Sequence, residues 1–137
     1  MNEIKRVTLR WTGDGLAFEG GGTTHPSIQV DGGSRAGPSP MELLLLSVAG
    51  CMAIDVRLIL DKARVPLTDL EVVTEGTRAD TEPRRYSRVK MHFRVVGPGE
   101  EHEARVARAV QLSKDKYCSV LHTLDPDLPI ETSIERS

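Results

Sequence analysis

The chain has 137 residues, 39% of them hydrophobic and 28% charged, and its 18 basic and 20 acidic residues give a formal net charge of -2. This is the composition of an ordinary folded protein, not of a disordered or fibrous one, and the length fits a single domain over residues 1–137. Basic and acidic residues are intermixed, so the sequence lacks the clustered basic surface that binding to nucleic acid or to an acidic membrane requires.

The N-terminus and the cysteines predict a cytoplasmic protein. Residues 1–6 carry charge where a signal peptide would need an apolar core. The longest apolar run, residues 43–54, is shorter than the roughly 18 residues that a membrane span needs. Two cysteines without an export signal favour a reducing compartment, where such a pair is more often redox-active or simply buried than a structural disulfide.

Short strands joined by glycine turns are predicted for the first part of the chain. Alternating and β-branched residues predict a strand over 6–11, and the turn at 12–15 connects it to a second strand over 16–19. A third strand is predicted at 28–31. The segment 32–38 is rich in glycine and has no apolar period, so it is predicted to be a flexible loop.

A long helix is predicted to begin at Ser39 and to continue to about Ala63, before Pro66. Ser39 can act as the N-cap, Pro40 suits the first helical position, and Glu42 is the reciprocal half of a capping box. The first half of this helix is apolar almost all round, which predicts deep burial. Because so short a domain has a modest core, any extra apolar face would have to be covered by a partner subunit.

The remaining elements are two strands, two helices and a last strand. Strands are predicted over 70–77 and 86–96 as a long hairpin, followed by helices over 100–114 and 118–124 and a closing strand over 130–135. Strands and helices are thus segregated along the chain and do not alternate regularly, which is typical of an α+β fold.

Cys51 lies on the predicted long helix, next to the small residues Ala49 and Gly50. Free cysteine is often a small core residue, and the same small neighbours would equally allow a substrate or a second helix to approach the sulfur. Asp55 lies one turn further along and would disfavour a thiolate unless a cation such as Arg57 offset it. The alternative for Asp55 is an ion pair with a basic residue at a subunit contact.

Cys118 follows two lysines and opens a predicted helix, and both features would lower the pKa of its thiol. The alternative is that Cys118 has no functional role and merely lies at a loop-to-helix junction. His122 lies four residues on, where a Cys–His pair or half a zinc site is conceivable. Since the chain has two cysteines and no CxxC or HxxxH pattern, a solvated or core histidine is favoured, and no metal is predicted.

Two short motifs stand out in the sequence, one leading to Cys51 and one around Cys118. Residues 39–44 (SPMELL) lead to Ala49-Gly50-Cys51, and Lys116-Tyr117-Cys118-Ser119 follows near the C-terminus. Together they resemble the OsmC/Ohr family of osmotically inducible and organic hydroperoxide resistance proteins, and most of all a less characterised OsmC-like subgroup. The similarity extends over nearly the whole chain. It implies an OsmC-like fold in which antiparallel sheets wrap around two long central helices of an intertwined homodimer.

The resemblance also implies a peroxiredoxin-like, cysteine-based peroxidase that acts in oxidative-stress defence. Cys51 would attack an organic hydroperoxide and become a sulfenic acid, and Cys118 would condense with it to a disulfide. A dithiol such as a lipoylated protein would then reduce the disulfide, without a metal or an organic cofactor. Arg35 and Glu42 are the candidates for the arginine and glutamate that support the reactive cysteine.

A departure from the family pattern keeps other functions open. In characterised members a glutamate directly follows the helix-starting proline, where this chain has Met41, so the capping role is favoured for Glu42. The main alternative is a non-enzymatic dimeric module that binds a small apolar or thiol-bearing ligand. A third is a dimeric structural protein with inert cysteines. Thiol reactivity distinguishes them, because an enzyme needs an accessible cysteine with a low pKa.

Overall fold

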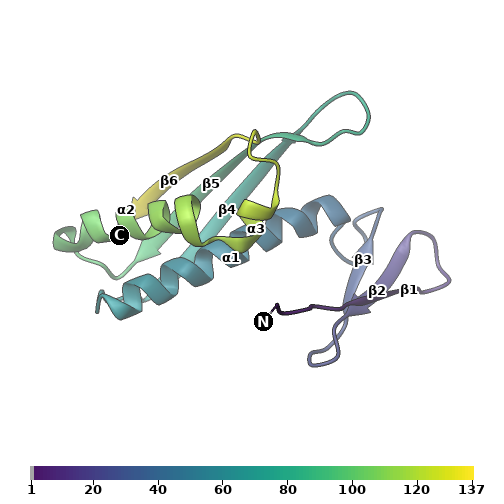
Figure 1. The fold of residues 1–137 in the computed structure, drawn as a ribbon, viewed down its shortest axis with the longest axis horizontal. Coiled ribbons are helices and arrows are strands. Elements are labelled where there is room, and N and C mark those ends of the chain that lie inside the picture. The colour runs from purple at the N-terminus through teal and green to yellow at the C-terminus, as the bar shows by residue number, and fades with distance from the viewer. Residues whose placement is uncertain (1) are drawn as a thin grey trace. The chain divides into compact units, whose positions relative to one another are not determined.

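A computed structural model describes residues 2–137 as two compact units, the first ending at Leu44 and the second beginning at Leu45 (Figure 1). Each unit has its own three-stranded sheet. The expected single domain over the whole chain stays a prediction. The α+β class is confirmed, since both sheets are accompanied by helices in one chain.

The first unit is built on the sheet β1-β2-β3, in which each strand is antiparallel to the next. The strands are β1 (Thr8–Trp11), β2 (Ala17–Gly21) and β3 (Ile28–Asp31), which confirms the three predicted strands. Between β1 and β2, Gly13 and Gly15 have φ angles of 92° and 50°. Only glycine adopts such angles without steric cost, which is why the turn is found at this point.

The second unit contains the sheet β4-β5-β6, formed by β4 (Asp69–Arg78), β5 (Tyr86–Val96) and β6 (Ile130–Arg136). The predicted antiparallel hairpin of β4 and β5 is confirmed. The expectation of purely antiparallel sheets is wrong for this unit, because β6 pairs with β5 in the parallel direction. After β5 the chain returns through helices before it enters β6, and such a crossover makes a parallel pair possible.

The helices are α1 (Pro40–Lys62), α2 (Glu103–Leu112) and α3 (Ser119–Thr123). A 3-10 turn, η1 (Glu100–His102), precedes α2, and a π-helical turn, η2 (Ser113–Tyr117), follows it. The helix predicted over 100–114 is therefore divided into three pieces. A π turn contains one more residue than an α turn, and such turns are frequent at functional sites.

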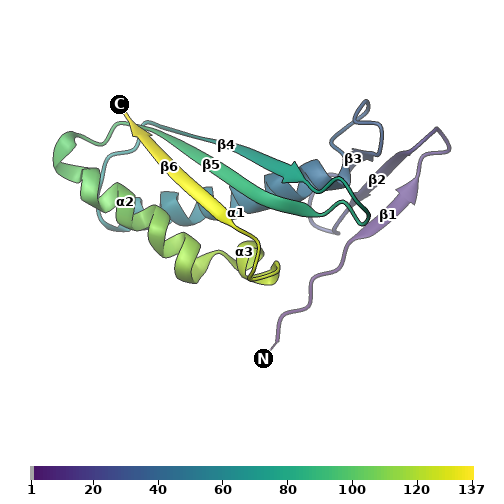
Figure 2. The same ribbon diagram turned by 90° about the horizontal axis from the view of Figure 1, so that it is seen from above.

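The helices α1 and α2 lie against one face of the second sheet, and the opposite face is open (Figures 1 and 2). The buried core between these layers comes from alternate residues of β5 and from one stripe each of α1 and α2. Its members are Val89, Met91, Phe93, Val95, Val48, Met52, Val56, Leu60, Val106, Ala109 and Val110. The period of two on the strand and the spacing of four on α1 are those of one buried face on each element.

The opposite side of α1 is exposed in the single chain, so the deep burial predicted for the first half of this helix is not reached within one chain and stays a prediction for the expected dimer. Leu46, Ile54 and Leu58 are 59%, 61% and 61% exposed. With Gly50 they follow one another at intervals of four residues, and we call these four residues the exposed stripe. A single sheet covers only one side of a helix, which is why half of this apolar helix remains open. By length and composition alone α1 could also cross a membrane, a test that core helices of soluble proteins pass as well.

The C-terminus of α1 is closed by a residue in the left-handed conformation. Arg64 has a φ angle of 59°, and its N–H donates to the carbonyl of Asp61 over 3.0 Å. The next residue, Val65, donates to the carbonyl of Leu60 over 2.9 Å, and both side chains are buried. This is a Schellman motif, which satisfies carbonyl groups that the helix end leaves open.

Candidate active site

The two cysteines, predicted from sequence as a reactive pair, meet in the second unit. Cys51 lies near the middle of α1 and is half-buried, whereas Cys118 lies directly after η2 and is completely buried. The side chain of Cys51 acts on Cys118, since it helps to raise the pKa of that thiol, and both are free thiols. Two residues that are far apart in the sequence therefore interact through their side chains.

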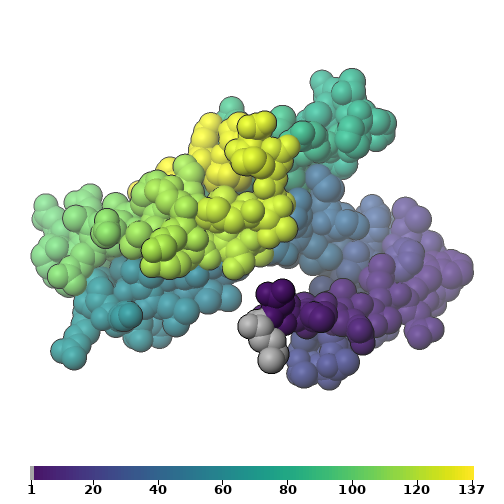
Figure 3. All heavy atoms as spheres, in the orientation of Figure 1, coloured from purple at the N-terminus to yellow at the C-terminus, as the bar shows by residue number. Residues whose placement is uncertain are grey.

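Cys118 is fixed by backbone hydrogen bonds on both sides. Its N–H donates to the carbonyl of Ser113 over 2.8 Å, which closes the π turn η2. Its sulfur accepts a hydrogen bond from the N–H of Leu121 over 3.3 Å and so acts as the N-cap of α3. In the space-filling view the atoms of α2, η2 and α3, in green and yellow, form one continuous surface (Figure 3).

The expectation that the Cys118 thiol has a low pKa is wrong. Burial raises its pKa from 9.0 to about 11, and the hydrogen bond with Cys51 and the charges of Cys51 and Asp55 act in the same direction. The N–H of Leu121 lowers the pKa, as expected for a helix start, but this effect is smaller than that of burial. The sequence shows two neighbouring lysines but does not show that the sulfur is shielded from water, and burial disfavours the charged form.

Asp55, one turn along α1 from Cys51, has a partner that the sequence did not indicate. The hydroxyl of Ser113 donates to Asp55 Oδ2 over 2.8 Å, across 58 positions of the chain. Arg57, the cation proposed to offset Asp55, instead forms an ion pair with Asp61 at 3.4 Å. Ser113 is completely buried and is the residue of this site that sequence reasoning missed. No local pattern marks it, because its contact depends on the packing of η2 against α1.

His122 takes part in the backbone structure around Cys118. Its Nδ1 lies 2.8 Å from the carbonyl oxygen of Cys118, and its Nε2 lies 3.0 Å from the carbonyl oxygen of Asp115. Both ring nitrogens are thus occupied by backbone groups, so a zinc ligand or a Cys–His pair is not what the geometry favours. Within residues 2–137, no group of three or more potential metal ligands is found.

Glu42, a candidate for the supporting glutamate, belongs to the first unit and caps α1. Its Oε1 accepts hydrogen bonds from the N–H of Ser39 over 3.0 Å and from the hydroxyl of Ser34 over 2.6 Å. In return, Ser39 Oγ accepts a bond from the N–H of Glu42 over 3.2 Å. These bonds, first the one from Ser34, lower the pKa of Glu42, and they confirm the predicted capping box.

Arg35, the candidate for the supporting arginine, also belongs to the first unit and lies in the loop around Asp31. The Asp31 carboxylate is buried and accepts bonds from the N–H groups of Gly33 and Ala36 over 2.8 and 3.0 Å. These bonds, first the one from Ala36, lower the pKa of Asp31, and the backbone and charge of Arg35 contribute. A role of Arg35 or Glu42 at Cys51 stays a prediction.

An open groove of about 630 Å³ runs along α1, and its lining includes Asp55, one turn from Cys51, and Tyr117, the residue before Cys118. Asp55 lines this groove and also contributes to the raised pKa of Cys118. The groove and the cysteine site therefore have this residue in common. The lining residues other than Asp55 are apolar for the most part and come from α1, α2 and η2: Leu58, Ile59, Lys62, Ala63, Leu112 and Tyr117. A mostly apolar groove beside a thiol pair is suited to an organic molecule.

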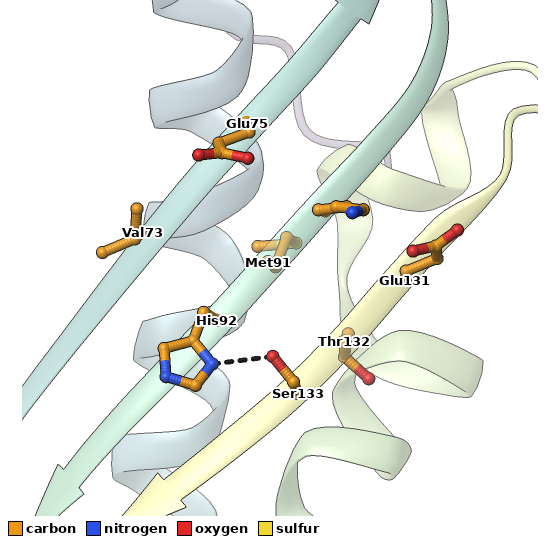
Figure 4. A pocket seen from close by; sticks show the side chains of 8 residues that line it. Val73, Glu75, Met91, His92, Glu131, Thr132 and Ser133 are labelled. Atoms are coloured by element: carbon orange, nitrogen blue, oxygen red, sulfur yellow. Dashed lines mark hydrogen bonds between the residues drawn. The ribbon is translucent and has the colours of Figure 1, made fainter.

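A second hollow, of about 320 Å³, lies on the open face of the sheet β4-β5-β6 (Figure 4). His92 Nδ1 lies 2.7 Å from Ser133 Oγ here, and Lys90, two residues before His92 on β5, is paired with Glu75 on β4 and Glu131 on β6. His92 therefore faces the open side of the sheet, opposite to the buried side chains of Met91 and Phe93. The hollow contains neither cysteine, so it is a surface of cross-strand polar pairs and not part of the thiol site.

Known proteins resemble this chain over its full length. The family model described as "OsmC-like protein" matches residues 31–133. Protein YhfA of Escherichia coli K12 is 41% identical over 131 residues, which are 95% of this chain and 96% of that protein. A crystal structure of a hypothetical protein from Aquifex aeolicus VF5 is 30% identical, with a TM-score of 0.87 and coverage of 99% and 98%.

A more distant structure carries a functional name. The protein from Legionella pneumophila described as an organic hydroperoxide resistance protein OsmC is 18% identical, with a TM-score of 0.68 and coverage of 97% of both chains. At this identity the likeness shows a shared fold. The family model covers most of the chain, and YhfA matches it nearly end to end at high identity. The chain therefore belongs to the OsmC-like family.

Proposed function

We propose that this protein reduces organic hydroperoxides with its two cysteines, as a cytoplasmic homodimer in oxidative-stress defence. The observation that carries the proposal is the contact between a half-buried Cys51 and a completely buried Cys118. A peroxide can reach only a sulfur that solvent can reach, whereas the resolving sulfur needs only to reach its partner. The unequal burial thus favours Cys51 as peroxidatic and Cys118 as resolving residue.

The cycle follows from this assignment. The Cys51 thiolate attacks the outer oxygen of the hydroperoxide, the O–O bond breaks, and the alkoxide leaves as an alcohol after taking up a proton. Cys51 is now a sulfenic acid. The sulfur of Cys118 attacks the sulfur of Cys51, the S–O bond breaks, and the hydroxide leaves as water with the proton of the Cys118 thiol. A dithiol, such as a lipoylated protein, then reduces the disulfide by thiol–disulfide exchange.

The family and the groove support an organic substrate. Organic hydroperoxide resistance is the name printed for the Legionella pneumophila protein of the same fold, while the name of YhfA states no activity. The groove beside Asp55 is lined mostly by apolar groups, which favour an alkyl or aryl hydroperoxide over hydrogen peroxide. The same groove also suits the alternative function, a module that binds a small apolar ligand without chemistry.

The exposed stripe supports a homodimer. Three large aliphatic side chains on one face of α1, each more than half exposed, are costly to leave in water, at about 25 cal/mol per Å² of apolar surface. The stripe has the spacing of a helix–helix contact, and the small Gly50 within it would allow the close approach of a second helix. A second copy of the same stripe is the occupant that we propose.

The test is a count of free thiols and an intact mass before and after an equimolar amount of cumene hydroperoxide. The wild type should lose both thiols with the mass change of a disulfide. The Cys118→Ser variant should stop at a sulfenic acid on Cys51, which dimedone traps. The matched Cys51→Ser variant should keep Cys118 reduced over the same time.

Three outcomes contradict the proposal. If both thiols of the folded wild type survive the peroxide, the cysteines are not a peroxidase pair, and ligand binding in the groove becomes the function to test. If Cys51→Ser is oxidised as fast as the wild type, the roles of the cysteines are reversed. Oxidation of Cys51 at the rate of a free thiol in solution would likewise mean that the protein adds nothing to the reaction.

A further inference from the structure

Two side-chain contacts join α1 to η2 and the residue after it. Cys51 interacts with the Cys118 thiol, and Asp55 accepts a hydrogen bond from the Ser113 hydroxyl over 2.8 Å. Cys51 and Asp55 are one turn apart on α1 and so lie on one face. Ser113 and Cys118 are joined by the backbone bond that closes the π turn. The two pairs therefore lie side by side, and a carboxylate with a fixed orientation is found next to the buried thiol.

We propose that Asp55 is a positioning residue that keeps Cys118 protonated in the reduced protein, so that Cys51 is the thiolate that meets the peroxide. The inference rests on the proposed two-cysteine cycle and names the group that assigns the two roles. A second negative charge beside a carboxylate in a site shielded from water is unfavourable, so the anion forms on the sulfur that is closer to water, which is that of Cys51. Ser113 prevents the carboxylate from turning toward solvent.

The other charged groups around Cys118 do not oppose this role strongly. Its own segment contributes Lys114, Asp115, Lys116 and His122. Lys116 is exposed, and its ammonium group lies 5.3 Å from the centre of the Tyr117 ring, so water screens its charge. The His122 ring is bonded to two backbone carbonyls. On the α1 side the facing groups are Cys51 and Asp55.

The ionisation of Cys118 supports the same assignment. Its pKa is raised to about 11, and both Asp55 and Cys51 contribute to this direction after burial. At pH 7 about one Cys118 thiol in ten thousand would then be ionised. A resolving cysteine that ionised freely would compete with Cys51 for the peroxide and could be overoxidised where Cys51 cannot resolve it.

The experiment compares Cys51→Ser with the double variant Cys51→Ser/Asp55→Asn, because Cys118 is then the single thiol that titrates. The ultraviolet absorbance of the thiolate is followed against pH, and the alkylation rate by iodoacetamide is measured at pH 8. The thiolate should appear at lower pH in the double variant. A fall of one pKa unit gives about ten times more thiolate but about threefold lower nucleophilicity, so alkylation should be about threefold faster.

The control is Asp61→Asn in the same background, which removes another carboxylate from α1 at an exposed ion pair with Arg57. It should leave both measurements unchanged. An unchanged titration of Cys118 in the Asp55→Asn variant, or an equal change in the Asp61→Asn control, overturns the inference. Circular dichroism verifies that each variant is folded.

A second pair of variants addresses the case in which Asp55→Asn does not fold. Ser113→Ala in the Cys51→Ser background releases the Asp55 carboxylate, so the thiolate of Cys118 should again appear at lower pH. Ser113→Thr keeps the hydroxyl and should restore the original titration, which a purely structural role of this residue would not produce. Identical titrations of Ser113→Ala and its parent count against the inference.

The outcome is separable from that of the proposed function. If Asp55→Asn changes the titration of Cys118 but the wild type does not react with cumene hydroperoxide, Asp55 controls the thiol and the peroxidase proposal fails. If the wild type completes the peroxide cycle and the titration of Cys118 does not depend on Asp55, the peroxidase stands and the role of Asp55 is refuted. If the peroxidase proposal and the role of Asp55 both hold, cumene hydroperoxide should oxidise the Cys118 thiol faster in Cys51→Ser/Asp55→Asn than in Cys51→Ser.

Discussion

The imidazole of His122 bridges two turns of backbone, because its Nδ1 lies 2.8 Å from the carbonyl oxygen of Cys118 while its Nε2 lies 3.0 Å from that of Asp115. One side chain thus ties the start of α3 to η2. Since Cys118 lies between these two turns, the bridge also holds Cys118 in its buried position. The thiol site therefore depends on a histidine that never touches a sulfur.

His122→Ala should lower the free energy of unfolding by about 1 kcal/mol, because it removes the ring that lies within hydrogen-bond distance of the Cys118 and Asp115 carbonyls. It should also make Cys118 easier to alkylate in the folded protein, since α3 is no longer tied to η2. Urea unfolding and site-resolved mass spectrometry measure the two effects. His92→Ala is the control, as it removes a histidine bonded to Ser133 on the open face of the sheet. Equal alkylation of Cys118 in both variants would contradict this view.

The reduced protein should lose stability at high pH through Cys118. The folded pKa of about 11 lies above the ordinary value of 9.0, so the stabilising contribution is complete below pH 9 and is lost as the pH rises through 11. The full difference corresponds to roughly 2 to 3 kcal/mol. Urea unfolding with a thiol reductant, from pH 8 to 11, should show a steeper decline for the wild type than for Cys118→Ser. Parallel curves would mean that Cys118 ionises in the folded state as it does in the unfolded chain.

Arg64→Gly should stabilise the protein by about 1 kcal/mol. Arg64 has a φ angle of 59°, at which a residue with a Cβ is strained, whereas glycine adopts this angle without strain. The midpoint of thermal unfolding should rise by a few degrees. Lys62→Gly is the control, since it lies in the last turn of the same helix with ordinary helical angles and should destabilise by about 1 kcal/mol. A loss of stability in Arg64→Gly would show that the arginine side chain has a role that the backbone angle does not account for.

Ile54→Glu should separate the proposed dimer into monomers, because it places a charge in the centre of the exposed stripe. Sedimentation velocity at several protein concentrations measures the effect. Val73→Glu is the matched control, as Val73 is 46% exposed on the open face of the sheet and its replacement should leave the association unchanged. A wild-type protein that sediments as a monomer at high concentration would refute the dimer itself.

Local sequence signals predicted those elements whose cause is local. The capping box of Ser39 and Glu42 marks the start of α1 to within a residue, and the alternation of β4 and β5 marks a hairpin that the structure confirms. The parallel direction of β6 was not predictable in the same way. It depends on the path of the chain through α2, η2 and α3, which no pattern within β6 records.

The candidate site was predictable in its cysteines but not in their chemistry. The motifs around Cys51 and Cys118 marked both residues, and the structure brings them together. The neighbouring lysines suggested a reactive Cys118, whereas burial, which is a property of the tertiary fold, raises its pKa. The bond between Ser113 and Asp55 spans 58 positions, so only the folded chain reveals it.

The sulfur that caps α3 has a further consequence. The side chain that caps a helix is usually one that oxidation does not change. In α3 the acceptor for the N–H of Leu121 is instead the Cys118 sulfur. A thiolate, a thiol and a disulfide differ in their strength as hydrogen-bond acceptors, so each changes the end of a helix of five residues. The exchange rate of the Leu121 amide hydrogen should therefore differ between the reduced and the oxidised protein.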